Sequence, residues 1–173
     1  MSDLSLDLPG IWTWVDPRAE TQADAIERVP ESALISSEAF KLRLMSAASR
    51  DVELLAICIE FAGALVDLHL ELGRAPRPID GDIHGLEAAA WSYSFAFGRA
   101  PSLDELVEAR DGRSSLRFQH HDYQVSYVRE SPDDDAPALV TFFLGERITP
   151  AVLEFCDMII VTSTWVTVEP SVA

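Results

Sequence analysis

The longest run of apolar residues lies between Arg50 and Leu72 and predicts a long helix. Most positions around such a helix are apolar, which is typical of a helix in the middle of a fold. Four carboxylates interrupt the run at spacings of seven, seven and four residues: Glu53, Glu60, Asp67 and Glu71. Because each helical residue turns by about 100°, these side chains would form a stripe roughly 40° wide. The pattern predicts a narrow acidic stripe along a largely buried helix.

Apolar periodicity and capping residues predict the other helices. These segments cover residues 22–29, 36–49, 86–97, 102–110 and 150–157. Ser36 or Ser37 begins the second segment, and Ser102-Leu103-Asp104-Glu105 is the pattern of a capping box. Thr149-Pro150 is typical of a helix start. Gly73 and Gly98 each follow an apolar helical pattern, so both are predicted to end helices. The aromatic residues within 91–97 also alternate as in a strand, which leaves that alternative open.

Alternating apolar positions predict strands mainly in the last third of the chain. A short extended segment around Trp12 and Trp14 is expected to dock on the core. The alternation changes parity at His120-His121-Asp122, which predicts a hairpin turn or a β-bulge there. Ala138 to Leu144 and Met158 to Val168 are predicted strands, and a loop is expected over residues 131–135.

These elements together predict a single α+β domain over residues 1–173. Residues 1–112 are expected to be mainly helical and residues 113–173 mainly strand. The predicted architecture places N-terminal helices on one face of a C-terminal, mostly antiparallel sheet of about four strands. The absence of strand–helix–strand alternation argues against a doubly wound nucleotide-binding sheet.

Composition adds one unusual property, which is a formal net charge of −16 in 173 residues. Such a charge repels phosphate backbones and anionic membranes and attracts cationic partners. The N-terminal residues lack the features of a signal peptide, so we expect a cytoplasmic protein. Cys58 and Cys156 lie in apolar runs and are expected to be buried, reduced thiols, with a disulfide between them as the alternative.

Candidate chemistry is sparse in the sequence, and we predict no catalytic residue, no cofactor and no metal site. His120 and His121 would need His84, with Asp80 and Asp82, to complete a set of metal ligands. The Asp80-Gly81-Asp82 segment lacks the later ligands of a calcium-binding loop. No nucleophile motif or glycine-rich phosphate loop occurs in the chain.

The leading hypothesis is a non-catalytic, acidic binding protein that neutralises a basic protein partner, as a bacterial toxin-immunity protein or an inhibitor does. The predicted partner-binding residues are the stripe and the acidic loop: Glu53, Glu60, Asp67, Glu71, Glu130, Asp133, Asp134 and Asp135. The stripe is alternatively only the solvent-facing edge of its helix. A second hypothesis is a small-molecule-binding protein or small enzyme. Its pocket would lie between the sheet and the aromatic helix, at Trp91, Tyr93, His120 and Tyr123. A third is a subunit of a larger assembly, since the sequence leaves the oligomeric state open.

Overall fold

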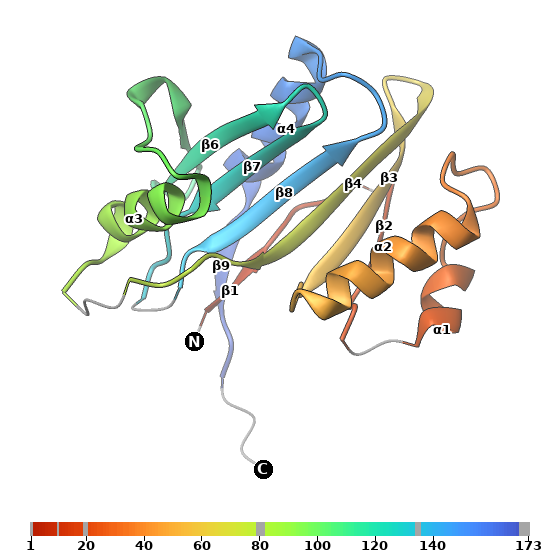
Figure 1. Ribbon diagram of the computed structural model, residues 1–173, viewed down its shortest axis with the longest axis horizontal. Helices are drawn as coiled ribbons and strands as arrows, with labels where there is room; N and C mark the ends of the chain where they lie inside the picture. The colour runs from red at the N-terminus through yellow and green to blue at the C-terminus, as the bar shows by residue number, and fades with distance from the viewer. Residues whose placement is uncertain (1, 10, 19–20, 79–81, 134–135, 170–173) are drawn as a thin grey trace.

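The computed structural model describes residues 2–9, 11–18, 21–78, 82–133 and 136–169. Within these residues, the largest element is a seven-stranded sheet in which all neighbouring strands are antiparallel (Figure 1). From edge to edge its strands are β2 (Trp12–Val15), β3 (Leu54–Phe61), β4 (Ala64–Arg74), β8 (Ala138–Leu144), β7 (Gln124–Arg129), β6 (Ser114–His121) and β5 (Leu106–Glu108). A separate ribbon pairs β1 (Ser2–Ser5) with β9 (Thr164–Thr167).

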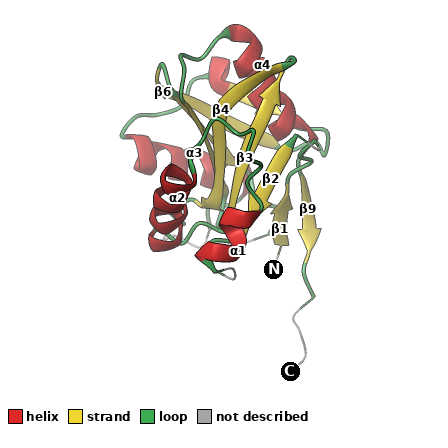
Figure 2. Ribbon diagram, turned by 90° about the vertical axis from the view of Figure 1, so that its right-hand side faces the viewer, coloured by secondary structure: helices red, strands yellow, loops and turns green. Residues whose placement is uncertain are grey.

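The described residues also form four α-helices, which lie on both faces of the sheet (Figure 2). They are α1 (Gln22–Glu27), α2 (Ser37–Ser49), α3 (Gly85–Phe97) and α4 (Pro150–Thr162). We call the face that contacts α2 and α3 the front face, because both helices lie before the sheet in Figure 1. The face that contacts α4 is the back face.

Three apolar clusters attach the helices to the sheet. On the front face, Phe40 and Leu44 of α2 pack with Leu55 and Ile57 of β3. Tyr93 and its neighbours on α3 pack over the β6 and β7 strands of the same face. On the back face, α4 contributes side chains to the largest cluster, which spans the middle strands of the sheet. The largest apolar cluster therefore covers the middle strands on the back face, whereas apolar contact on the front face lies at its two sides.

The prediction of a helix over residues 50–72 is wrong, because this segment forms the β3–β4 hairpin. β3 is a central strand whose two faces are both buried: Leu55 and Ile57 face α2, whereas Ala56 and Cys58 face the back cluster. A strand buried on both faces is continuously apolar and lacks the period-2 signal of a half-exposed strand. The turn occurs at Ala62 and Gly63, which both have positive φ.

The predicted fold class is also wrong in its architecture. The large sheet has seven strands rather than about four, and the helices are distributed along the chain rather than gathered at the N-terminus. Residues 1–112 are consequently not mainly helical, since they contain β1 to β5 as well as three of the helices. The additional strands come chiefly from the segment that its apolar pattern had assigned to a helix.

Three further element predictions need correction. Residues 102–110 form the 3-10 turn η1 (Leu103–Glu105) and then β5, so the capping interaction from Ser102 N–H to Glu105 (2.9 Å) begins no α-helix. The predicted strand over 158–168 is instead the end of α4 followed by the short β9. Gly73 lies inside β4 and ends no helix.

Other predictions are confirmed at the level of single elements. β2 forms at the two tryptophans, and Ser36 accepts the hydrogen bond that caps α2. Thr149 caps α4 with proline in its first turn, and Gly98 ends α3 with φ +69°. The β6–β7 hairpin carries the expected irregularity of register between Gln119 and His121. Both cysteines are buried and free.

Candidate functional site

The centre of the front face is polar, and Figure 1 shows no helix before it between α2 and α3. Strand register places Glu71 of β4, Thr141 of β8 and Ser126 of β7 side by side in one row. Asp67 and His69 share this face because side chains alternate along β4. We call these five residues the polar floor. Four of them, all except Asp67, are buried.

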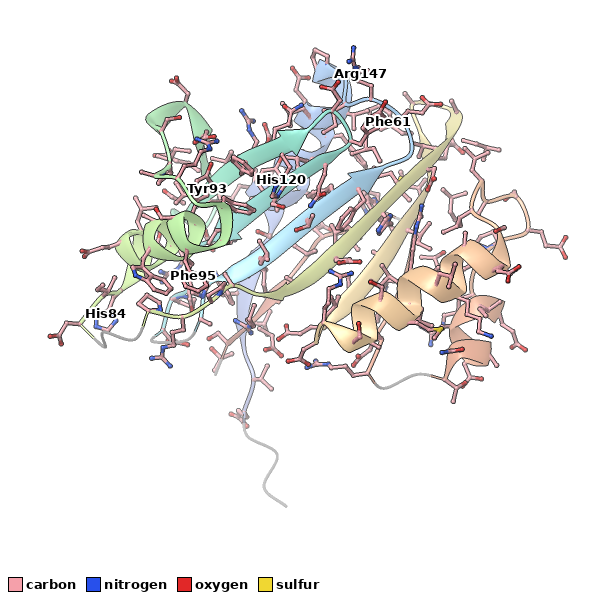
Figure 3. All side chains as sticks on the ribbon, viewed as in Figure 1. Phe61, His84, Tyr93, Phe95, His120 and Arg147 are labelled. Carbon is pink, nitrogen blue, oxygen red and sulfur yellow. The ribbon has the colours of Figure 1, made fainter. Side chains whose placement is uncertain are left out.

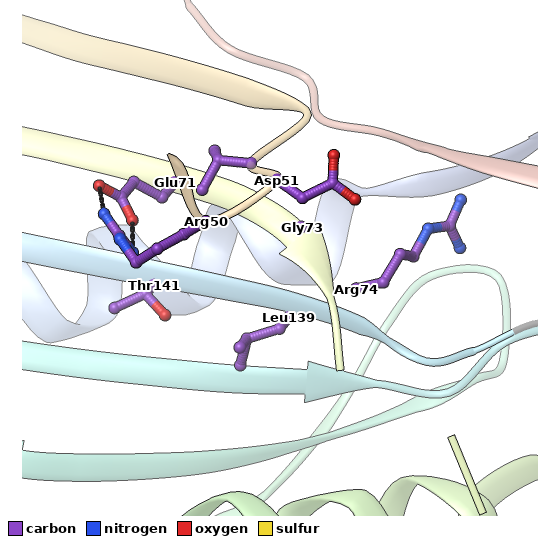
Figure 4. Close-up of a pocket in the computed structure, with 8 residues that line it drawn as sticks. Arg50, Asp51, Glu71, Gly73, Arg74, Leu139 and Thr141 are labelled. Atoms are coloured by element: carbon purple, nitrogen blue, oxygen red, sulfur yellow. Dashed lines mark hydrogen bonds and ion pairs between the residues drawn. The ribbon is translucent and has the colours of Figure 1, made fainter. Parts of the chain in front are cut away.

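Two arginines of the α2 segment bind the polar floor. Arg50 donates two hydrogen bonds of 2.7 Å to the Glu71 carboxylate (Figure 4). Arg43 donates to both oxygens of Asp67, at 3.0 and 3.3 Å. Hydrogen bonding to Glu71 raises the pKa of Arg50 further above its ordinary value. Glu71 is only 6% exposed, so its charge depends on this paired contact for stabilisation.

His69 lies between these two ion pairs and is 7% exposed. Its ring stacks on Phe143 of β8, with the centroids 4.6 Å apart. Burial lowers the pKa of His69 to about 3, and the charges of Arg43 and Arg50 act in the same direction. The buried Nδ1 atom has no hydrogen-bond partner among the described residues. His69 is therefore neutral at physiological pH and serves as an uncharged spacer between two charge pairs.

A chain of hydrogen bonds crosses three strands on the α3 side of the floor. Nε2 of His120 lies 3.0 Å from Oγ of Ser126, which lies 3.0 Å from Oγ1 of Thr141. Figure 3 shows His120 on the front face of the sheet. The serine–histidine distance is one that a nucleophile and its base use. However, Ser126 is 1% exposed, so a substrate cannot reach its hydroxyl in this arrangement.

A pocket of about 370 Å³ opens beside the floor at the C-terminal end of α2 (Figure 4). It is lined by Arg50, Asp51, Val52, Glu71, Gly73, Arg74, Leu139 and Thr141. Its volume lies in the range of small-ligand sites. Both guanidinium groups in the lining already hold carboxylates, since Arg74 contacts Glu53 and Asp3 at 3.3 and 3.1 Å. An anionic ligand would therefore compete with the protein's own carboxylates for these groups.

The structure separates the eight residues that were predicted to bind a partner. Glu53, Asp67 and Glu71 each hold an arginine, as described above, and the helix that would have aligned them with Glu60 does not form. Glu60 is exposed on β3. The remaining acidic residues are placed as follows: Glu130 accepts the Ser114 N–H at 3.1 Å, Asp133 accepts the Ser2 hydroxyl at 2.6 Å, and Asp134 and Asp135 lie outside the described residues.

The predicted pocket under the aromatic helix is filled by side chains. Tyr93 is fully buried and makes edge contacts with Phe97 and Phe118. His120 packs against the same two phenylalanines, at centroid distances of 4.6 and 4.5 Å. Tyr123 lies exposed in the β6–β7 turn. Tyr93 and Phe97 of α3 thus attach the helix to the sheet, whereas Phe95 is exposed and stacks on Trp91.

The candidate metal ligands do not come together in the described part of the chain. His84 is the N-cap residue of α3, and Figure 3 shows it apart from His120. Asp80 lies outside the described residues, and Asp82 is exposed. Among the residues that the structure describes, no three His, Cys, Asp or Glu side chains form a group that could hold a metal ion.

A second concave surface, which the sequence did not indicate, lies where the β1–β9 ribbon meets the β2 edge of the sheet. We call it the N-terminal groove; its volume is about 530 Å³. It is lined by Asp3, Leu4, Ser5, Leu6, Asp7, Leu8, Trp14, Leu54, Val166 and Val168. The detectable signal in the sequence is the pair of nearby tryptophans, of which Trp12 is buried and Trp14 is 53% exposed.

No protein-family model, curated protein or solved structure matches this chain. Among the described residues, no helix combines the length and the apolar character needed to cross a membrane.

Proposed function

We propose that this protein is a non-catalytic, acidic binding protein that neutralises a basic polypeptide partner, in the manner of an immunity protein or an inhibitor. The observation that supports the proposal is the use that the chain makes of its cations. At least nine of its arginines form ion pairs with its own carboxylates: Arg18, Arg43, Arg50, Arg74, Arg99, Arg113, Arg117, Arg129 and Arg147.

Internal pairing of the cations affects the charge that an approaching partner meets at the surface. The chain has 29 acidic and 13 basic residues, so pairing most of the bases leaves the acidic excess of −16 facing solvent. A field of this sign steers cationic proteins into encounter and raises association rates, most strongly at low salt. Acidic proteins and nucleic acids are repelled by the same field.

The ion pairs also make the acidic surface a rigid one. Arg43 and Arg50 join α2 to β4, and Arg117 joins β6 to Asp157 of α4 at 2.6 Å. Tyr127 of β7 donates to the same Asp157 carboxylate, also at 2.6 Å. Helices fixed to the sheet in this way present their exposed carboxylates with little conformational entropy to lose, and such preorganisation favours tight binding.

Copurification followed by kinetics tests the proposal. The tagged protein is expressed in its source cells, bound polypeptides are eluted with salt, and the recovered partner is identified. We expect a basic polypeptide whose association rate falls at least tenfold between about 0.05 and 0.5 M salt. A neutral or acidic partner, or a rate that salt leaves unchanged, would contradict the proposal.

A charge-reversal variant sharpens this test at one predicted contact residue. Glu60 is exposed, whereas Glu53 and Glu71 are held by arginines, so Glu60→Lys changes the surface without breaking an observed ion pair. If Glu60 lies within the contact surface, the variant slows association more than Glu38→Lys on α2, which makes the same change of charge elsewhere. Equal effects of the two variants would remove Glu60 from the contact surface and leave only the general field.

A further inference from the structure

The N-terminal groove combines exposed apolar side chains with carboxylates. Trp14 is 53% exposed, and Val166 and Val168 on the β9 side are 50% and 43% exposed. Apolar residues this exposed, gathered in one concave surface, are typical of sites that bind another molecule. The groove lies at the free edge of the large sheet, because β2 is the terminal strand.

Strand alternation explains why these side chains face the groove. In the β1–β9 ribbon, Leu4 pairs with Trp165, and both pack on the back cluster. The neighbouring pair is Asp3 with Val166, which points to the opposite side of the ribbon. The Asp3 carboxylate, which is paired with Arg74 at 3.1 Å, is thereby placed next to an exposed valine. Asp7 adds a second carboxylate to the lining, and it forms no ion pair with the described residues.

The charge of the protein decides between the possible occupants of the groove. A second copy of this chain also carries −16, so two copies repel each other at the distances of an encounter. A cationic segment is attracted by the whole protein and can place a basic side chain beside Asp7. The apolar lining requires that the same segment also carry apolar side chains.

We propose that the N-terminal groove binds an extended segment of the basic partner in which apolar and basic residues alternate. The inference rests on the proposed function and assigns it a place on the surface. Trp14 is the central apolar contact, since a large, half-exposed aromatic side chain gains most from being covered. Asp7 is the charged contact at the rim, where a carboxylate contributes to selectivity and association rate.

Synthetic octapeptides test the inference on the full chain by titration calorimetry. The probes are alternating leucine–lysine, alternating leucine–glutamate and alternating serine–lysine peptides. We expect the leucine–lysine peptide to bind at least tenfold more tightly than either of the others, because only it satisfies both the apolar lining and the Asp7 carboxylate. Equal affinity for the leucine–glutamate peptide would overturn the assignment of a basic ligand.

Variants then locate the binding. Trp14→Ser should weaken leucine–lysine binding at least tenfold, and Asp7→Asn about threefold. The matched controls are Phe95→Ser on α3, where an aromatic side chain is 66% exposed outside the groove, and Asp104→Asn in η1. Both controls should retain binding within twofold of the parent chain. Thermal unfolding of all four variants verifies that each is folded.

The outcomes separate this inference from the proposed function. Binding of the leucine–lysine peptide that survives Trp14→Ser in the folded variant would overturn the groove as its site, while a basic ligand would still support the proposed function. A partner recovered from source cells that is not basic would contradict the proposed function and the groove's occupant with it. Loss of binding in Trp14→Ser together with retention in Phe95→Ser supports the inference.

Discussion

The back face of the sheet meets α4 through a continuous apolar cluster, whereas the front face carries charged and hydroxyl side chains at its centre. On the back face, Phe142, Leu70 and Cys58 are fully buried against Ile159 and Ile160 of α4. On the front face, the equivalent positions of β4 and β8 are Glu71, His69 and Thr141. The two faces of the same strands are therefore buried by different interactions.

The comparison shows how one sheet can hold both a core and a polar floor. The back cluster gains stability from the apolar area that it removes from water. The polar floor gains little from burial, because desolvation of its charges offsets much of their attraction. Its ion pairs instead specify where α2 lies on the sheet. Along β4 and β8, the back face thus contributes mainly stability and the front face contributes to the positioning of α2.

Truncating the back cluster should have the largest effect. Phe142→Ala removes a fully buried ring whose centroid lies 5.7 Å from that of the Tyr127 ring. We therefore expect a loss of about 3–5 kcal/mol in the free energy of unfolding. Urea unfolding followed by circular dichroism measures the loss. The control is Phe95→Ala on exposed α3 surface, which should cost less than about 0.5 kcal/mol. Similar losses in the two variants would show that the back cluster is not the main source of stability.

Breaking one ion pair of the polar floor should have the next largest effect. Arg50→Ala leaves the Glu71 carboxylate buried without its guanidinium and should cost about 2–3 kcal/mol, less than for a fully buried pair because Arg50 is half exposed. Chemical unfolding measures this cost at neutral pH. Arg147→Ala breaks the exposed pair with Asp122 and should cost less than about 1 kcal/mol.

The double variant Arg50→Met, Glu71→Met tests whether stability requires the two charges themselves or only that neither charge is left without its partner. Because both charges are removed together, no buried carboxylate is left unpaired, and stability should stay within about 1 kcal/mol of the parent chain. A double variant as unstable as Arg50→Ala would show that the charges themselves, and not their pairing, hold α2 on the sheet.

The same contrast explains which parts of the fold the sequence could predict. β8 and the start of α4 follow local rules, namely strand propensity over 138–144 and Thr149-Pro150 at a helix start, and both predictions are correct. The β3–β4 hairpin could not be recognised from its pattern, because β3 is covered on both faces and its period-2 alternation is lost. Gly63 was the local signal of a turn within this apolar run.

The candidate site was less predictable than the fold. Asp67, His69 and Glu71 share a face in a strand because they are two residues apart, whereas a helix separates neighbours two apart by about 200°. The error in secondary structure therefore also misplaced the charges. Their partners Arg43 and Arg50 come from another element, and a single sequence gives no indication of which arginine meets which carboxylate. The groove depends on contact between the two ends of the chain and had no local signal beyond Trp14.

His69 gives the polar floor a pH dependence of predictable sign. Its pKa is about 3 in the folded chain and about 6.5 when unfolded, so between these values the unfolded chain binds more protons. The contribution of His69 to the free energy of unfolding therefore rises with pH in this window. This contribution is lost progressively as the pH falls below about 6.5. The groups that face His69 are Arg43 and Arg50 from α2 and Asp67 and Glu71 from β4.

The expected size of the effect follows from one proton. Below about pH 6, a single such histidine lowers the free energy of unfolding by about 1.4 kcal/mol for each pH unit of acidification. Lowering the pH from 7 to 5.5 should therefore reduce the free energy of unfolding by about 1 kcal/mol through His69. His69→Phe keeps the stack on Phe143 and should lose this part of the pH dependence, as measured by urea unfolding at both values. A variant with the same slope as the parent chain would assign the pH dependence to other groups.

The last expected effect is comparably small and concerns the hydroxyl chain between His120 and Thr141. Ser126→Ala removes the atom that lies 3.0 Å from both neighbours and leaves the Thr141 hydroxyl without this partner, so we expect a cost of about 1–2 kcal/mol at neutral pH. Thermal or urea unfolding measures the cost. Ser49→Ala on exposed α2 surface is the control and should change stability by less than about 0.5 kcal/mol. If Ser126→Ala changed stability as little as this control, the hydroxyls at the centre of the front face would form hydrogen bonds with water rather than with one another. The polar floor would then be held by its arginines alone.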